Sequence, residues 1–438
     1  MTSGDVAGES VRYLQDLLRI DTTNPPGGET AAAEYLAGVL RREGYEPVVL
    51  ESAPGRGNVV ARYRGTGELP PLLLYGHLDV VTAEADRWTH GPFSGVVADG
   101  CVWGRGALDM KSMVAQELMV MLLLMRRGVR PARDIIFAAT ADEEAGGHAG
   151  IGYLVDYHPD LIRAEYALSE GGGMTMYFAG RPFYDVRTAE KGYCRFHLRA
   201  HGSPGHGSVP RPESAIAVLA EAVVRLTSTP LPFRATPTLT ALFAALGETF
   251  GLPRQQWAPT EANVRSMLDL LPPSLVHYLN AITRDTAVPT GLRAGTRINV
   301  VPSEAEAWVD GRYLPGQTAE GFLEEVRQVI GDACEIDHVD ISLPLEDPAA
   351  GPLYNRIVAV MRRHTPEAPV LPFLLSGATD AKHVSRLGAR CLGFSPVRVS
   401  ADFPAEQLVH GHDERIPVDG YLWGLQVLHD IVGEFCGA

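Results

Sequence analysis

Short apolar runs alternate with segments of helical periodicity in the first part of the chain, and this alternation constrains the fold more than any other feature. Each run is short enough for a single strand, and each helical segment places its apolar residues on one face. Strands that alternate with helices imply an α/β sheet covered on both faces, so the sequence predicts a three-layer α/β/α domain. The predicted helices are 8–20, 30–43 and 113–127, and the predicted strands are 47–50, 58–63, 72–75 and 134–140.

A second pattern begins near residue 190 and interrupts the first. Its elements follow the ferredoxin-like order β-α-β-β-α-β once a Pro-rich, partly helical stretch up to about residue 289 is set aside. The α/β pattern then resumes, and 438 residues exceed what one core usually supports. We therefore predict one domain of residues 1–190 and 346–438 and an inserted α+β domain of residues 191–345. The elements predicted in the insert are strands 193–200, 236–242, 304–314 and 335–343 and helices 212–227 and 318–330.

Composition and charge exclude several classes of protein. The chain carries 38 Lys and Arg against 53 Asp and Glu, a formal charge of −15, with no basic patch that would suit nucleic acid. Its most apolar run, 118–125, is too short for a bilayer, which needs about 20 residues. The five cysteines are scattered without a CxxC pair, and the N-terminal residues resemble no signal peptide. We therefore expect a cytoplasmic protein that binds neither nucleic acid nor membrane.

Histidine and carboxylate side chains follow the predicted strands where these end. The run Leu72 to Tyr75 delivers His77, and because side chains alternate along a strand, His77 and Asp79 can lean the same way. A carboxylate in that position can hold one imidazole nitrogen and leave the other for a metal ion. Asp109 follows two glycines and precedes a helix, where it serves as a metal ligand or as a helix N-cap.

Three adjacent carboxylates, Asp142, Glu143 and Glu144, follow another predicted strand, and cations or solvent must compensate their repulsion. Glu170 comes after a further apolar run, and His410 lies in a histidine-rich segment near the C-terminus. Together these motifs can supply the two histidines and three carboxylates that a two-metal hydrolytic site requires, with one carboxylate between the ions. A closed structural zinc site is excluded because no cysteine clusters with these motifs.

The chain resembles a known family at these residues. The motifs GHLDVV, GRGALDMKS, ADEEAGG, SEGGG and HGHDERIPV match, in order and spacing, the zinc metallopeptidases that include aminoacylase, glutamate carboxypeptidase, acetylornithine deacetylase and succinyl-diaminopimelate desuccinylase. The resemblance runs from residues 23–25 to the C-terminal helix. Its closing stretch, GATDAKHV to VHGHDERIPVDGY, is most similar to the carboxypeptidase S and N-acyl-amino-acid hydrolase branch.

The resemblance implies an enzyme that hydrolyses the amide bond of an N-acyl amino acid or of a short peptide with a free carboxylate. A dipeptidase or a biosynthetic N-deacylase is the alternative within the family. A non-catalytic binding protein on the same scaffold would be expected to lose Glu143 or Asp109, and both are present. The residues 1–190 and 346–438 correspond to the family's catalytic domain, and the insert 191–345 corresponds to its lid and dimerisation domain.

The resemblance also implies a role for each motif residue. Two metal ions, zinc or alternatively cobalt or manganese, are bound by five side chains. Asp109 lies between the two ions, and the peptide bond after it is cis in relatives. Glu143 is the general base that takes a proton from water, and Asp79 orients a ligand histidine. The family spacing selects His410 over His412. The implied ligands are His77 and Glu170 for one ion, Glu144 and His410 for the other, and Asp109 for both.

In the insert, the Gly-rich turn with His206 resembles the lid histidine that stabilises the tetrahedral oxyanion, from its own or a neighbouring subunit of a homodimer. Asn299 and Arg312 resemble the residues that hold the substrate carboxylate, for which a guanidinium fork is suited. A turn-forming Asn and a strand-surface salt bridge are the alternatives. Gly377 is assigned to the same substrate pocket, although its motif SGATD departs from many relatives at Ala378.

Overall fold

The computed structural model describes residues 4–178, 180–251, 253–268 and 273–438, and contacts between Cα atoms divide the chain into two units. Unit 1 comprises Met1–Thr188, Asp347–Pro372 and Thr379–Ala438, and unit 2 comprises Ala189–Glu346 and Phe373–Ala378. The segment 373–378, predicted to lie in the first domain, thus belongs to the inserted unit. Among the described residues, no helix is long and apolar enough to cross a membrane.

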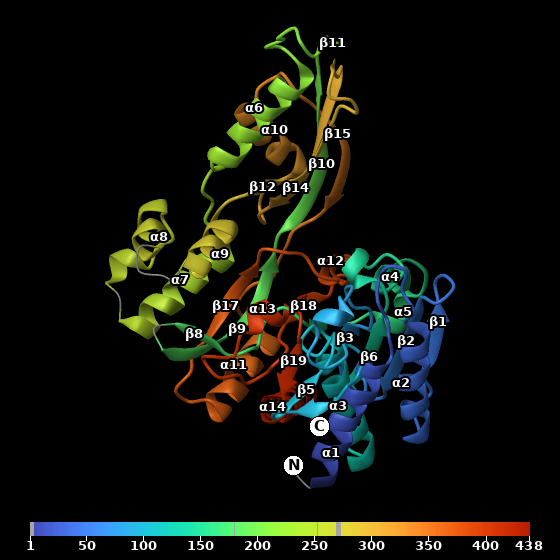
Figure 1. Ribbon diagram of the computed structural model, residues 1–438. Coiled ribbons are helices and arrows are strands. Elements are labelled where there is room, and N and C mark those ends of the chain that lie inside the picture. The colour runs from blue at the N-terminus through green and yellow to red at the C-terminus, as the bar shows by residue number, and fades with distance from the viewer. Residues whose placement is uncertain (1–3, 179, 252, 269–272) are drawn as a thin grey trace. The chain divides into compact units, whose positions relative to one another are not determined.

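The predicted α/β class is confirmed in unit 1 by a mixed sheet whose central strands are parallel (Figure 1). The strand order is β1-β2-β6-β3-β7-β18, and β9 continues the sheet beyond β18. The first two strands pair antiparallel at one edge. The bounds are β1 Val48–Glu51, β2 Gly57–Tyr63, β3 Leu69–His77, β6 Arg133–Thr140, β7 Tyr166–Ser169, β8 Met176–Phe178, β9 Arg181–Glu190, β17 Val370–Leu375 and β18 Arg390–Gly393.

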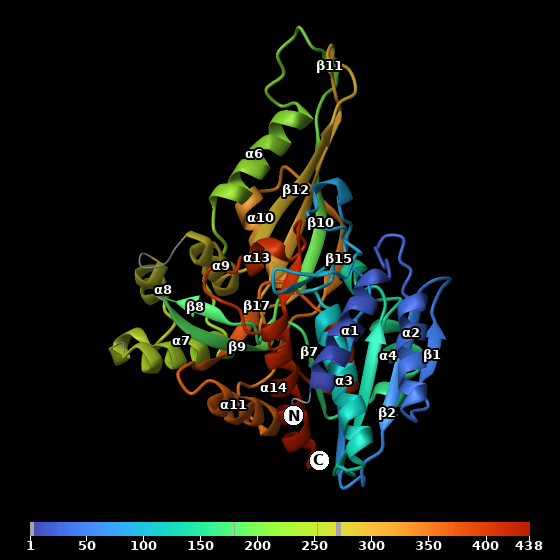
Figure 2. The ribbon, with the colours of Figure 1, turned by 60° about the horizontal axis from the view of Figure 1, so that its bottom comes forward.

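Helices and short strands complete the unit. The predicted helices at the N-terminal end are confirmed as α1 Gly4–Arg19, α2 Thr30–Arg42 and α3 Lys111–Arg127. The helix α14, Val418–Cys436, packs against α3 (Figure 2). The other elements are α4 Ile151–Tyr157, α5 Pro159–Ile162, α11 Pro352–His364, α12 Ala381–Val384, α13 Ala405–Leu408, and the short strands β4 Val97–Ala98, β5 Cys101–Trp103 and β19 Arg415–Pro417.

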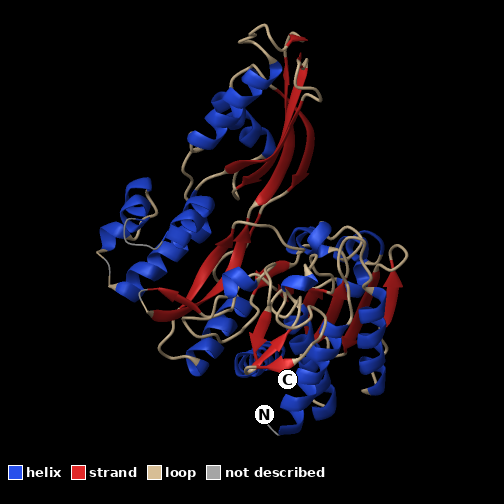
Figure 3. Cartoon of the chain, viewed as in Figure 1, coloured by secondary structure: helices blue, strands red, loops and turns tan. Residues whose placement is uncertain are grey.

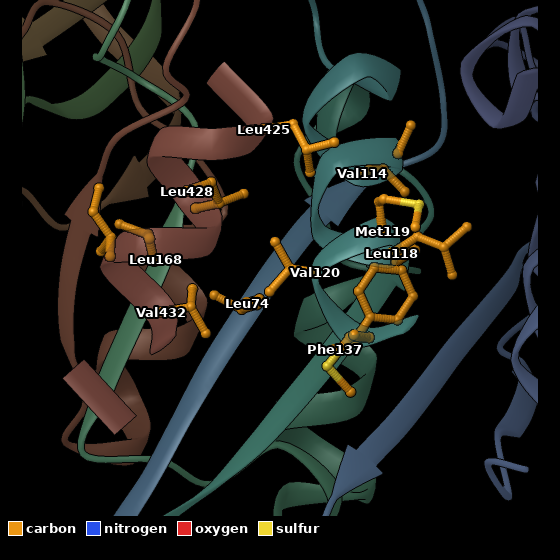
Figure 4. Packing of buried hydrophobic residues seen from close by; sticks show 14 of the residues in the cluster. Leu74, Val114, Leu118, Met119, Val120, Phe137, Leu168, Leu425, Leu428 and Val432 are labelled. Carbon is orange, nitrogen blue, oxygen red and sulfur yellow. The ribbon is translucent and has the colours of Figure 1, made fainter. Parts of the chain in front are cut away.

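Both faces of the central sheet are buried. Side chains alternate between the faces of a strand, yet four consecutive residues of β3, Leu72 to Tyr75, are all buried. Leu74 packs with Val120 of α3 and Phe137 of β6 in the main core of the unit (Figure 4). A parallel strand covered on both sides reads as a continuous apolar run, and this explains why β3 was recognisable in the sequence.

Unit 2 contains a four-stranded antiparallel sheet of order β12-β14-β10-β15, with two helices on one face (Figure 3). The chain order β10-α6-β12-β14-α10-β15 is the ferredoxin-like order. The bounds are β10 Gly192–His201, α6 Ala215–Ser228, β12 Thr286–Ala294, β14 Glu304–Tyr313, α10 Ala319–Ile330 and β15 Glu335–Ser342. The remaining elements are β11 Gly205–His206, β13 Val300–Val301, β16 Leu345–Glu346, and the helices α7 Pro237–Phe250, α8 Glu261–Leu268 and α9 Pro273–Thr283.

The predicted strand 236–242 is wrong, because these residues begin helix α7. The Thr236 hydroxyl caps the helix by accepting the N–H of Leu239 at 3.1 Å, and Pro237 occupies the first turn. The second strand of the ferredoxin-like order is β12 instead. It contains Pro289 beside a shift of register, which is tolerated because β12 is an edge strand.

We expect the core under β3 to dominate the stability of unit 1. Leu74→Ala should lower the free energy of unfolding by about 2–5 kcal/mol, because it leaves a cavity in a fully buried site. The matched control is Leu69→Ala in the same strand, where the side chain is 44% exposed and the change should stay within about 0.5 kcal/mol. Urea denaturation measures both, and equal losses would contradict this description of the core.

Candidate metal centre

Strand direction brings the predicted ligands to one edge of the sheet in unit 1. His77 is the last residue of β3, and Glu170 directly follows β7. Glu144 lies in the 3-10 turn Glu143–Ala145 after β6. Since β3 runs parallel to both neighbours, the carboxyl ends of the three strands meet at the same edge. Asp109 reaches this edge from the turn before α3, and His410 from the loop after α13.

Asp109 lies at the centre of the five side chains and faces two ways. Its Oδ1 is 3.1 Å from His77 Nε2, and its Oδ2 is 3.2 Å from His410 Nε2. Glu170 Oε2 is 3.8 Å from His77 Nε2, and Glu144 Oε1 is 3.3 Å from His410 Nε2. The residues thus form two groups of three potential ligands that share Asp109, and within each group the ligand atoms lie within 4.8 Å of one another.

The charges of this cluster fit divalent cations. Burial alone would lower the pKa of His77, but the carboxylates of Asp109, Asp79 and Glu170 outweigh it and hold that pKa well above its ordinary value. Asp109 and Glu144 raise the pKa of His410 to about 10. The carboxylates around both imidazoles therefore favour nearby positive charge. Neutral imidazoles with carboxylate oxygens are the ligand types that zinc takes, so the residues fit two such ions.

Glu143 is separate from the ligands although it adjoins Glu144. It belongs to neither group of potential ligands among the described residues. Burial, followed by the charge of Glu170, raises its pKa well above the ordinary value. The surroundings of Glu143 thus favour its protonated form more than those of an exposed glutamate do.

Asp79 fixes the acidic turn as well as the ligand histidine. Its Oδ1 accepts the N–H of Glu143 at 3.0 Å, and its Oδ2 accepts the N–H of Glu144 at 3.1 Å. The Asn24 amide donates to the same Oδ2 at 2.8 Å. His77 Nδ1 lies 3.0 Å from the Asp79 carbonyl and 3.5 Å from Oδ1, so the shorter contact with the imidazole is made by the main chain. Nδ1 of His77 therefore has a partner in Asp79, and Nε2 faces Asp109.

Glu414 holds the loop of Asp109, and no role was predicted for it. This carboxylate is fully buried, and its Oε1 accepts the N–H groups of Leu108 at 2.7 Å and Asp109 at 3.2 Å. Its Oε2 accepts from Arg105 Nη1 at 2.7 Å and from the N–H of Gly106 at 3.0 Å. Arg105 also donates to the Gly411 carbonyl at 2.8 Å, next to His410. Glu414 and Arg105 thus fasten two ligand loops together. The motif HGHDE was the only signal for this role.

The peptide bond between Asp109 and Met110 is cis, as the family resemblance implied. His412 was not selected as a ligand by the family spacing. It lies 3.5 Å from Glu84, and among the described residues it belongs to neither ligand group.

Asp380, like Glu414, had no predicted role. It is buried, and among the described residues neither of its carboxylate oxygens has a hydrogen-bond partner. Burial raises its pKa to about 7, against the opposing charge of Lys382. Gly147 of the acidic turn permits its close approach, because a Cβ there would lie 2.0 Å from Asp380 Oδ1.

In unit 2, the structure brings His206 and Asn299 together. Their segments pair as β11 and β13, and the N–H of Gly207 donates to the Asn299 carbonyl at 2.9 Å. Asn299 lies in a turn, so the turn-forming alternative describes its place. His206 is exposed, and its Nδ1 accepts the N–H of Ser208 at 3.2 Å.

Arg312 lies near the end of β14 and pairs with Asp310 of the same strand. Its Nε and Nη2 donate to the two carboxylate oxygens of Asp310 at 3.0 and 3.1 Å, which is the salt bridge expected as the alternative. Gly377 also lies in unit 2, where a Cβ would lie 3.9 Å from the Leu375 side chain. The roles of these residues in substrate binding stay predictions.

Comparisons with known proteins agree with these motifs. A family model described as peptidase family M20/M25/M40 matches residues 73–434. The chain is 33% identical over 391 residues to a probable carboxypeptidase S-like 2 of Dictyostelium discoideum, covering 83% of this chain and 73% of that protein. It is 31% identical over 441 residues to the N-fatty-acyl-amino acid synthase/hydrolase PM20D1 of Mus musculus, covering 94% and 84%. The solved M20 family metallo-carboxypeptidase Sso-CP2 from Sulfolobus solfataricus superposes with a TM-score of 0.73 at 18% identity, covering 98% of this chain and 100% of that chain.

We expect Glu414→Gln to weaken metal binding without unfolding the protein. The amide keeps the shape of the side chain, but it replaces an acceptor with a donor that faces other donors and removes the charge opposite Arg105. Affinity for zinc should fall by about 10–100-fold, as for other residues that orient ligands. Calorimetric zinc titration measures the change, and exposed Glu406→Gln is the matched control. Unchanged affinity in Glu414→Gln would show that the loop is held by other contacts.

Proposed function

The chain belongs to peptidase family M20/M25/M40 and is a metal-dependent hydrolase, and we propose that it uses two zinc ions to cleave the amide bond of an N-acyl amino acid. A short peptide with a free carboxylate is a substrate of the same class. The observation that carries the proposal is the position of Asp109, with one carboxylate oxygen toward each of two histidines. The similarity to proteins named as carboxypeptidase S-like and as N-fatty-acyl-amino acid synthase/hydrolase supports the substrate class.

Five side chains would hold the ions, with His77 and Glu170 on one side of Asp109 and Glu144 and His410 on the other. When bound, the ions would supply the positive charge that acidifies a water molecule and polarises the amide carbonyl. Cobalt and manganese accept the same types of ligand, so the choice of zinc rests on ligand chemistry and on the family.

Glu143 would move the proton. In its ionised form the carboxylate takes a proton from the attacking water, and it then returns that proton to the nitrogen of the leaving amine. Its raised pKa suits the second step, since burial and the charge of Glu170 favour the protonated form that then gives up the proton. Asp79 supports both glutamates of the turn by accepting their N–H groups, which fixes the main chain from which the side chains of Glu143 and Glu144 extend.

His206 would stabilise the oxyanion of the tetrahedral intermediate. Its Nδ1 accepts the N–H of Ser208 and lies 2.7 Å from Ser208 Oγ, so in a neutral imidazole the proton would lie on Nε2, where it could be donated to the oxyanion. The substrate carboxylate would be bound by Asn299, Arg312 and Gly377. Arg312 would give up its salt bridge with Asp310 to pair with the substrate. In a homodimer formed through unit 2, His206 would act in either its own or the neighbouring subunit. The proposed location is the cytoplasm, in agreement with five free cysteines.

We expect Glu143→Gln and Glu144→Gln to separate chemistry from metal binding. Glu143→Gln should keep both zinc ions and lower kcat by about 10²–10⁴-fold, the contribution of a positioned general base. Glu144→Gln is the matched control at the next residue and should lose one ion, because it changes a ligand. Metal analysis by mass spectrometry and hydrolysis of N-acyl amino acids test the pair. Loss of metal in Glu143→Gln alone would mean that the two roles are reversed.

We expect Arg312→Ala to lower kcat/KM strongly for substrates that end in a carboxylate and much less for the corresponding amides, because the guanidinium pairs only with the charged group. The matched control is Arg195→Ala. Arg195 lies 3.5 Å from the same Asp310 and is more exposed than Arg312, so its loss tests the general charge of this surface. Equal losses on acids and amides in Arg312→Ala would remove it from carboxylate recognition.

A further inference from the structure

We propose that unit 2 carries a separate binding site for a divalent transition-metal ion, formed by His197 of β10 and by Asp337 and His338 of β15. Each offers a potential ligand atom, and the three atoms lie within 4.8 Å of one another. The strands are neighbours in the antiparallel sheet of unit 2 (Figures 1 and 2). None of the three belongs to the centre built on Asp109, so the proposal goes beyond the hydrolytic function.

A bulge between the two strands creates the site. Arg195 pairs with Asp340 and His197 with Asp337, so the two intervening residues of β15 oppose a single residue of β10. Consecutive side chains of a regular strand point to opposite faces, which would separate Asp337 from His338. At this bulge His338 has a φ of 50°, in the left-handed region, and its ring centroid lies 4.8 Å from that of His197. The irregular backbone therefore gathers all three side chains.

The Glu306 carboxylate would orient His197 as a metal ligand. Its Nδ1 lies 2.9 Å from Glu306 Oε1 of the adjacent strand β14. An Nδ1–H that donates to this carboxylate leaves the lone pair of Nε2 available. A carboxylate behind an imidazole is a common arrangement at metal sites, where it fixes the tautomer and strengthens the ligand.

Asp337 offers an oxygen that the protein leaves unsatisfied. Oδ2 lies 3.2 Å from Arg199, whereas Oδ1 is buried and has no hydrogen-bond partner among the described residues. A buried acceptor without a partner lowers stability, and a cation would satisfy it. His338 Nε2 is 4.0 Å from this Oδ1. The carboxylates of Asp337 and Glu306 outnumber the single guanidinium of Arg199, so the local charge favours a cation.

The ligand set determines the class of ion. Two imidazoles and one carboxylate suit zinc, copper or nickel, whereas magnesium and calcium prefer oxygen ligands throughout. Three protein ligands leave a further position for water or for another ligand. The His338 side chain is 63% exposed, so the site is open to solvent.

The test is zinc binding to the full-length protein, measured by equilibrium dialysis with elemental analysis. Wild-type protein should bind one ion more per chain than Asp337→Asn or His338→Asn, where Asn also tolerates the left-handed backbone. Glu306→Gln should weaken the additional ion by about 10–100-fold. The matched control is His201→Ala, on the same strand and beside Glu304 and Glu335, which should keep the additional ion.

A second measurement locates the ion without relying on activity. The Trp308 ring lies 6.2 Å from that of His197, so copper bound at the site should quench the fluorescence of Trp308. This part of the quenching should be absent in Trp308→Phe. Equal zinc stoichiometry in wild type and in both Asn variants would overturn the proposal, as would loss of the ion in His201→Ala. Quenching of the Trp308 fluorescence that persists in His338→Asn would also overturn it. Hydrolysis should stay unchanged in all these variants, so failure here is distinguishable from failure of the hydrolytic centre.

Discussion

The shared carboxylate of Asp109 is the interaction on which the rest of the centre depends. One oxygen faces His77 and the other faces His410, and these histidines come from opposite ends of the chain. Each oxygen of a carboxylate offers lone pairs to a cation, and these stay available when neighbouring donors have other partners. The N–H groups of Leu108 and Asp109 donate to Glu414, so the main chain around Asp109 is satisfied without using its side chain.

Buried charge around this carboxylate positions loops. Removing ions from water is costly, and a buried pair such as Arg105 with Glu414 often recovers little of that cost as stability. The pair instead fixes the positions of two loops, because Glu414 accepts hydrogen bonds from the turn before Asp109 while Arg105 donates to the loop of His410. Asp79 does the same for the acidic turn, where one carboxylate accepts two consecutive N–H groups. Buried carboxylates thus hold the loops that carry the candidate ligands.

The sequence predicted those parts of the molecule that depend on local pattern. The strand β3 and the helix α3 were visible because periodicity and buried apolar runs are local. The candidates His77, Glu144 and Glu170 followed from strand ends, whereas Asp109 and His410 rested on their motifs and on the family resemblance. The strand β12 was missed, since Pro289 and a bulge disguise it, and Thr236 was assigned to a strand although it caps α7. The holding role of Glu414 could not be predicted, because its partners lie about 300 residues away in sequence and only the fold supplies their N–H groups.

The same distinction explains why the two clusters of potential metal ligands differ in how readily a sequence reveals them. Around Asp109, parallel strands end at a common edge, so polar residues that follow apolar runs are brought together by a regular rule of the fold. On the sheet of unit 2, His197 and Asp337 face each other across antiparallel strands, and His338 joins them only because the register shifts. A regular β15 would direct that histidine to the opposite face. Departures from regular pairing are therefore where a sheet can gather ligands that strand periodicity would keep apart.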